Sequence, residues 1–151
     1  MTDQEVLRLV EAAFADVPRP EHFTNFTHCE ECAEHDELLR SRDCSNLNVS
    51  DVGNPGWDPL CFSSGQGIAY FMPALARLAL APPTYDFGWY GSQLLFHLGR
   101  EERTNQLFAF CNAEQRAAVL ALLRQYSQNQ PEEAACHQEE IDRARSLWGE
   151  A

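Results

Sequence analysis

Apolar residues recur every three to four positions in several segments of the chain, and this period is typical of amphipathic helices. Between residues 43 and 59 the pattern breaks down into Asn, Ser, Gly and Pro, which predicts a long ordered loop. We expect a short extended segment over residues 60–63. No pair of segments has the pattern of a β-hairpin. The pattern therefore predicts an all-α fold, a compact bundle of about six helices in a single domain over residues 1–151. The helices are expected at residues 3–16, 28–42, 65–80, 89–98, 113–127 and 131–148.

Polar residues mark most of the expected helix ends. Capping boxes, in which the first and fourth residues exchange hydrogen bonds, are predicted at Thr2–Glu5, Thr27–Glu30 and Asn112–Gln115. Ser64 is placed to cap the helix at 65–80, and Gly99 is expected to end its helix in the left-handed conformation.

The segment 65–80 is the most apolar of the chain and is expected to be central and buried. Its continuous apolar part is too short to cross a bilayer, and it contains Pro73 and Arg77. The first residues resemble no secretory signal, which predicts a cytoplasmic protein. Thiols stay reduced in that compartment, so the six cysteines are expected to be free thiols or ligands rather than three disulfides.

Acidic residues outnumber basic ones by 23 to 11, giving a net charge of −12. This charge repels phosphate backbones and anionic membranes, so neither nucleic acid nor a membrane is an expected partner, whereas a basic protein would be attracted. All the basic residues are arginine, which is typical of a GC-rich bacterial genome.

One Cys-x-x-Cys sequence carries the clearest chemistry. Cys29 and Cys32 lie three positions apart at an expected helix start, and His28 and His35 share an adjoining face with Cys32. Thiolate and imidazole are the ligands that zinc prefers, so these four residues form a candidate zinc site. A further ligand could come from elsewhere in the chain. The candidates for it are Cys61, Cys44, His22 and His97.

Two other interpretations of the same sulfurs stay open. A thiol at a helix N-terminus is acidified by the helix dipole and suits redox chemistry, but Glu30 and Glu31 oppose that effect and no strand precedes the motif. Alternatively, Cys29 and Cys32 serve as small half-buried apolar residues. A single Cys-x-x-Cys is also less than the two pairs of a typical structural zinc module.

No catalytic constellation is identifiable, which favours a protein that is not an enzyme. The chain has neither a phosphate-binding glycine loop nor a Gly-x-Ser-x-Gly elbow. The dipeptide His35-Asp36 is similar to the metal pair of helical HD phosphohydrolases, but the other ligands of that site have no clear counterpart. His97 is expected to be a hydrogen-bonded core histidine, and Trp57 to fix the long loop onto the core.

Three segments resemble a bacterial protein family of unknown function: His28 to Asp36, Gly53 to Pro59 and Pro73 to Ala79. The resemblance spans roughly residues 20 to 125. It implies one bacterial domain and brings no activity with it.

Two hypotheses of function follow from the sequence. The first is a bacterial cytoplasmic protein that holds a structural zinc through Cys29 and Cys32, with His35 and His28 as further ligands. The alternative is an acidic binding protein, such as an immunity or inhibitor protein that covers a basic partner. Its acids gather in two expected helical segments, Glu30 to Glu37 and Glu132 to Asp142.

Overall fold

The computed structural model describes residues 1–149, and that range is built from helices with no β-strand. The all-α prediction is therefore confirmed. The elements are α1 (Asp3–Phe14), α2 (Glu30–Arg40), α3 (Val49–Val52), η1 (Pro59–Phe62), α4 (Gly65–Leu80), α5 (Tyr90–Gly99), η2 (Glu102–Thr104), α6 (Gln106–Phe110), α7 (Ala113–Asn129), α8 (Pro131–Cys136) and α9 (Gln138–Gly149), where η1 and η2 are 3₁₀ turns.

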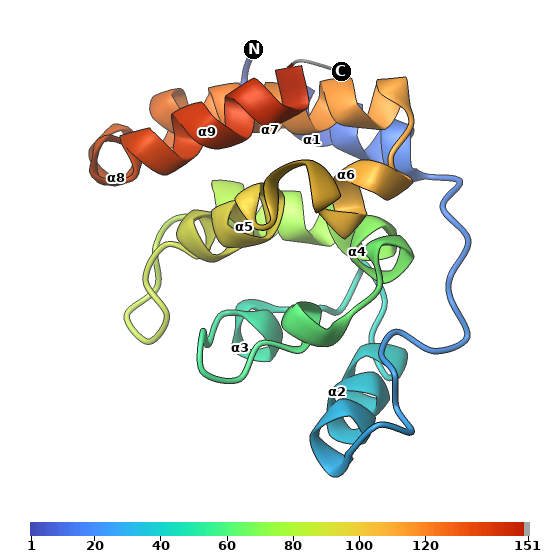
Figure 1. Ribbon diagram of the computed structural model, residues 1–151. Coiled ribbons are helices and arrows are strands. Elements are labelled where there is room, and N and C mark those ends of the chain that lie inside the picture. Colours follow the sequence, from blue (N-terminus) through green and yellow to red (C-terminus); the bar gives the residue numbers. More distant parts are fainter. Residues whose placement is uncertain (150–151) are drawn as a thin grey trace.

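The helices lie in three tiers (Figure 1). α1, α7 and α9 form one tier, and α4, α5 and α6 pack beneath it. α2 and α3 lie on the far side of α4, where both contact η1. The N-terminal half of the chain thus leaves the bundle after α1, builds the outer tier and returns through η1 into α4.

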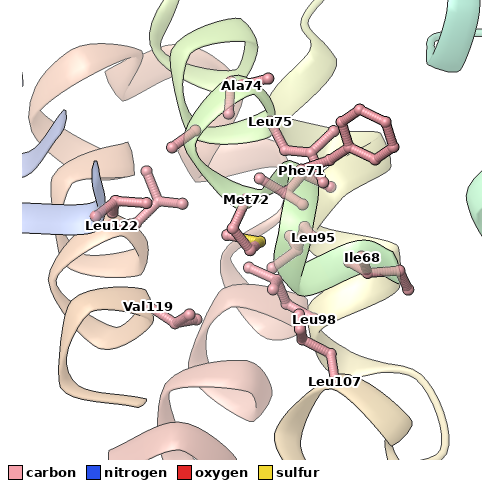
Figure 2. Close-up of a cluster of buried hydrophobic side chains, with 14 of the residues drawn as sticks. Ile68, Phe71, Met72, Ala74, Leu75, Leu95, Leu98, Leu107, Val119 and Leu122 are labelled. Carbon is pink, nitrogen blue, oxygen red and sulfur yellow. The ribbon is translucent and has the colours of Figure 1, made fainter. Parts of the chain in front are cut away.

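The core is centred on α4, because this helix is apolar on nearly every side. Met72 is fully buried between α7, which contributes Val119 and Leu122, and α5, which contributes Leu95 and Leu98 (Figure 2). Buried apolar side chains of this size dominate the stability of a small domain.

Two arginines attach the outer tier to the bundle. Arg19 donates to the carbonyl oxygens of Leu39, Arg40 and Arg42 at 3.4, 2.9 and 2.7 Å, at the C-terminal end of α2. Arg77 on α4 donates to the carbonyl oxygens of Cys44 and Leu47 at 3.0 and 3.3 Å. Carbonyls left free at a helix end favour such cationic donors.

Several expected elements are confirmed. α4 begins after Ser64, whose side chain accepts from the amide of Gly67. α7 carries the expected capping box between Asn112 and Gln115. Thr2 caps α1 by accepting from the amide of Glu5.

Other expectations were wrong, and short local turns explain most of them. The loop at 43–59 contains α3, which Asn48 and Asp51 cap, and residues 59–62 form η1 instead of an extended piece. Gly99 is the last helical residue of α5, and the left-handed residues are Glu101 and Glu102.

Three further differences concern the second half of the chain and Trp57. The segment at 131–148 is helical but breaks at His137 into α8 and α9, and η2 and α6 lie where no element was expected. Trp57 is 43% exposed instead of buried in the core.

No helix among the described residues is long and apolar enough to cross a membrane.

Replacing Met72 by Ala should test the central packing. Because Met72 is fully buried, we expect the free energy of unfolding to fall by about 2–5 kcal/mol in urea denaturation. The control is Tyr85→Ala, since Tyr85 is fully exposed and its loss should change stability by no more than about 0.5 kcal/mol. Equal losses in the two variants would contradict the assignment of the core.

Candidate metal centre

The first turn of α2 is held in place by the chain that precedes it. The buried carboxylate of Asp36 accepts from the amides of Phe23 and Thr24 at 2.6 and 3.1 Å, and His22 Nδ1 lies 2.7 Å from its other oxygen. The hydroxyl of Thr24 donates to the carbonyl oxygen of Cys32 at 2.6 Å. Burial acts to raise the pKa of Asp36, but the hydrogen bonds from His22 and from the two amides outweigh it and lower the pKa.

α2 begins one residue after Cys29, and this differs from the capping box predicted at Thr27 and Glu30. Cys29 is the N-cap, and its sulfur accepts from the amide of Cys32 at 3.4 Å. The hydroxyl of Thr27 donates instead to Asn25. Because the helix starts just after Cys29, the sulfur of Cys29 points back over the first turn, toward Cys32.

Three of the four predicted ligands come together here. The two sulfurs lie 3.4 Å apart, and Nδ1 of His28 lies 3.8 Å from the sulfur of Cys32. One ligand atom from each of these residues lies within 4.8 Å of the other two. His28 and Cys29 are exposed, whereas Cys32 is buried, so the group opens to solvent on one side.

The surroundings of the two thiols shift their pKa values in opposite directions. The pKa of Cys29 is lowered to about 7 by the hydrogen bond from the amide of Cys32, and then by the hydrogen bonds with His28 and with the thiol of Cys32. The pKa of Cys32 is raised, first by its hydrogen bond to Cys29 and then by burial. The exposed thiol of Cys29 therefore loses its proton at a lower pH than the buried thiol of Cys32.

His35 lies outside this group, although it was predicted as a ligand. Its ring is fully buried and packs on Trp57 and Phe62, with ring centroids 4.4 and 4.6 Å apart. Both ring nitrogens are without a hydrogen bond, and Nε2 lies 3.6 Å from a carboxylate oxygen of Glu31. The sequence did not signal this aromatic enclosure, since Trp57 and Phe62 are distant along the chain.

The four further ligand candidates are engaged elsewhere. His22 contacts Asp36, and the thiol of Cys44 donates to the carbonyl oxygen of Tyr70 at 3.1 Å. Cys61 and His97 belong to a second group, with Asp58. The expectation that His97 is a hydrogen-bonded core histidine is confirmed, because its Nε2 lies 2.6 Å from Asp58 and the residue is 1% exposed.

Comparison with protein-family models, curated proteins and solved structures finds no match for this chain. The resemblance to a bacterial family therefore stays a prediction.

The pKa of Cys29 gives a direct test of the site geometry. In metal-free protein the rate of alkylation by iodoacetamide at Cys29 should rise with pH and reach half of its maximum near pH 7, because the thiolate is the nucleophile. Peptide mass spectrometry measures the rate at this residue. The reference is a short unstructured cysteine peptide, whose half-maximum should lie about 1.5 pH units higher. Coincident profiles would show that the amide of Cys32 does not hold the sulfur.

Proposed function

We propose that this protein binds one zinc ion through the sulfurs of Cys29 and Cys32 and Nδ1 of His28. The observation that carries the proposal is the convergence of two sulfurs and one imidazole nitrogen within 4.8 Å. Zinc binds sulfur at about 2.3 Å and imidazole nitrogen at about 2.0–2.1 Å, so small side-chain movements would close these atoms around an ion.

The electrostatics of the site support a cation. Glu30, Glu31, Glu34 and Glu37 are exposed around the motif and raise the local concentration of cations. The pKa of Cys29 near 7 means that one ligand needs little help to lose its proton. A divalent ion would supply the remaining stabilisation for the thiolate of Cys32.

His35 is the best-placed fourth ligand. It follows Cys32 by three positions on the same helix, and neither nitrogen of its buried ring makes a hydrogen bond. Rotation of the ring away from Phe62 would be needed for it to reach the ion. Without that rotation, water completes the coordination on the exposed side.

The role of such an ion would be structural. It would tie His28, in the chain before α2, to the first turn of the helix. The segment 20–30 contains little regular structure, so this link adds to the hydrogen bonds of Asp36 and Thr24.

Zinc stoichiometry tests the proposal. We expect one zinc per chain after purification, measured by elemental analysis, and a thermal unfolding midpoint that rises with added zinc. Cys32→Ser should remove the zinc and that rise. Cys136→Ser is the matched control, because Cys136 is also a free cysteine but lies outside both ligand groups, and it should keep the zinc. Protein that stays metal-free at excess zinc would contradict the proposal.

The fourth ligand is tested by His35→Phe. Phenylalanine preserves the packing on Trp57 and Phe62 and removes only the nitrogens, so we expect zinc affinity to fall by at least about tenfold with the fold intact. Competition with a chromophoric chelator measures the affinity. An unchanged affinity would assign the fourth position to water.

The exposed surface beside the site favours a second candidate function, the binding of a basic protein. Trp57 and Phe62 are 43% and 39% exposed, and both rings contact His35 on α2. They therefore lie beside the helix that carries the acidic residues. Large aromatics with neighbouring charges are typical of protein interfaces. Association of this kind should weaken steeply with salt, which a pull-down at two ionic strengths would show.

A further inference from the structure

A second cluster of reactive side chains lies away from the Cys-x-x-Cys motif, where η1 meets α5. Asp58 caps η1 and Cys61 lies within it, while His97 is near the end of α5. The Cys61 sulfur, one ring nitrogen of His97 and one carboxylate oxygen of Asp58 all lie within 4.8 Å of one another. The sequence separates these residues by up to 39 positions, so only the fold brings them together.

The carboxylate of Asp58 fixes the imidazole of His97. Both side chains are fully buried, and His97 Nε2 lies 2.6 Å from Asp58 Oδ2. The same oxygen accepts from the side-chain amide of Gln93 at 2.6 Å, and the other oxygen accepts from the amide of Leu60 at 2.9 Å. An ionised carboxylate only accepts, so Nε2 donates to Asp58, and a neutral ring in this tautomer would present a lone pair at Nδ1.

That second nitrogen is the unexplained feature of the core. Nδ1 of His97 is buried and has no hydrogen-bond partner among the described residues. A buried polar atom without a partner costs free energy, and such atoms often mark catalytic or ligand sites. His97 lines a pocket of about 60 Å³, and Cys61 and Arg100 line it as well.

We propose that Cys61 is a nucleophile for acyl transfer, with His97 as its general base, Asp58 as the residue that positions the imidazole, and a short activated acyl group as substrate. A thiol, an imidazole nitrogen within 4.8 Å of it and a carboxylate that orients the imidazole are the parts from which such chemistry is built. The side chain of Arg100 supplies a positive charge at the same pocket.

The size and lining of the pocket select the substrate class. A volume of about 60 Å³ has room for on the order of four water-sized groups, which suits an acetyl or propionyl chain and excludes a long one. Leu60, Ile68 and Leu107 line part of the pocket and Ser63, Asn105 and Gln106 line another part, so a short chain that carries one carbonyl group matches this mixed lining. The leaving group would remain on the solvent side, since Cys61 is only partly buried.

The reaction balances with water as the only co-reactant. The sulfur of Cys61 attacks the acyl carbon of an ester or thioester, and the thiol proton passes to His97. The bond from the acyl carbon to the leaving group breaks, and the leaving group takes that proton. Water then attacks the thioester on Cys61, gives a proton to His97 and releases the carboxylic acid, while the proton returns to the sulfur.

The ionisation of Cys61 explains why a base is needed. Burial raises the pKa of this thiol, and the charge of Asp58 adds to that effect, while Arg100 acts in the opposite direction. A thiol of this kind is protonated at neutral pH and reacts slowly unless a neighbouring group removes its proton.

The experiment uses the full chain with Cys29, Cys32 and Cys136 replaced by Ser, which removes the exposed thiols and both sulfur ligands of the proposed zinc site. p-Nitrophenyl acetate is the probe, and peptide mass spectrometry follows the acetyl group on each remaining cysteine. Cys44 is the matched reference within the same molecule, because it is also partly buried with a raised pKa but its thiol donates to a carbonyl oxygen.

We expect Cys61 to be acetylated about 10²-fold faster than Cys44 and then to lose the acetyl group by hydrolysis. His97→Gln should remove most of this advantage, and Cys44→Ala should leave the rate of acetylation at Cys61 unchanged. Acetylation of Cys61 at the rate of Cys44, or a rate that His97→Gln leaves unchanged, would overturn the proposal. Neither result bears on the proposed zinc site, because this variant lacks both of its sulfur ligands.

The positioning role of Asp58 has its own test, which also serves if His97→Gln does not fold. Asp58→Asn retains an acceptor for the amide of Leu60 but loses the charge that adds to burial in raising the pKa of Cys61, so the pH at half-maximal acetylation should move down. Cys61, Arg100 and Glu101 line the same pocket as the imidazole, and Tyr90, whose pKa is raised by burial and then by the charge of Asp58, is the further titratable group that interacts with Asp58 and Cys61. A slower reaction with an unmoved pH profile would reduce Asp58 to a structural residue and contradict the proposed relay.

Discussion

The free amides at the start of α2 are the constraint on which the proposed zinc site depends. A helix leaves its first amides without backbone partners, and here the sulfur of Cys29 accepts from one of them, the amide of Cys32. That hydrogen bond places the sulfur over the turn that carries Cys32, so the two sulfurs approach to 3.4 Å. A helix that began at Thr27 would enclose Cys29 in its first turn and would not turn its sulfur back in this way.

The short segment 57–62 joins the two chemical centres of the molecule. Trp57 and Phe62 contact the ring of His35 on α2, whereas Asp58 and Cys61 gather with His97 on α5. α2 packs on this segment, and Arg19 donates hydrogen bonds to carbonyl oxygens at the C-terminal end of α2. The ring of His35 therefore links α2 to this segment.

Long apolar periods made the fold largely predictable from the sequence. α4 and α7 are long, strongly patterned and clearly capped, and both appear where expected. The errors fall on short elements such as α3 and η1, because four residues carry no period and depend on side-chain caps from Asn48 and Asp58.

The candidate zinc site was predicted more completely than its surroundings. His28, Cys29 and Cys32 are close in sequence, and the N-cap turn at the start of α2 brings them together. The burial of His35 depends on rings from a distant loop, and the pairing of His97 with Asp58 depends on tertiary packing. Neither contact produces a local pattern in the sequence, because the residues that it joins are far apart along the chain.

X-ray absorption at the zinc edge, on protein loaded with one equivalent of zinc, tests the proposed centre most directly. Coordination by Cys29, Cys32 and His28 predicts two sulfur neighbours at about 2.3 Å, with nitrogen or oxygen at about 2.0–2.1 Å in the remaining positions. A first shell of nitrogen and oxygen alone, with no sulfur, would contradict zinc binding at the start of α2.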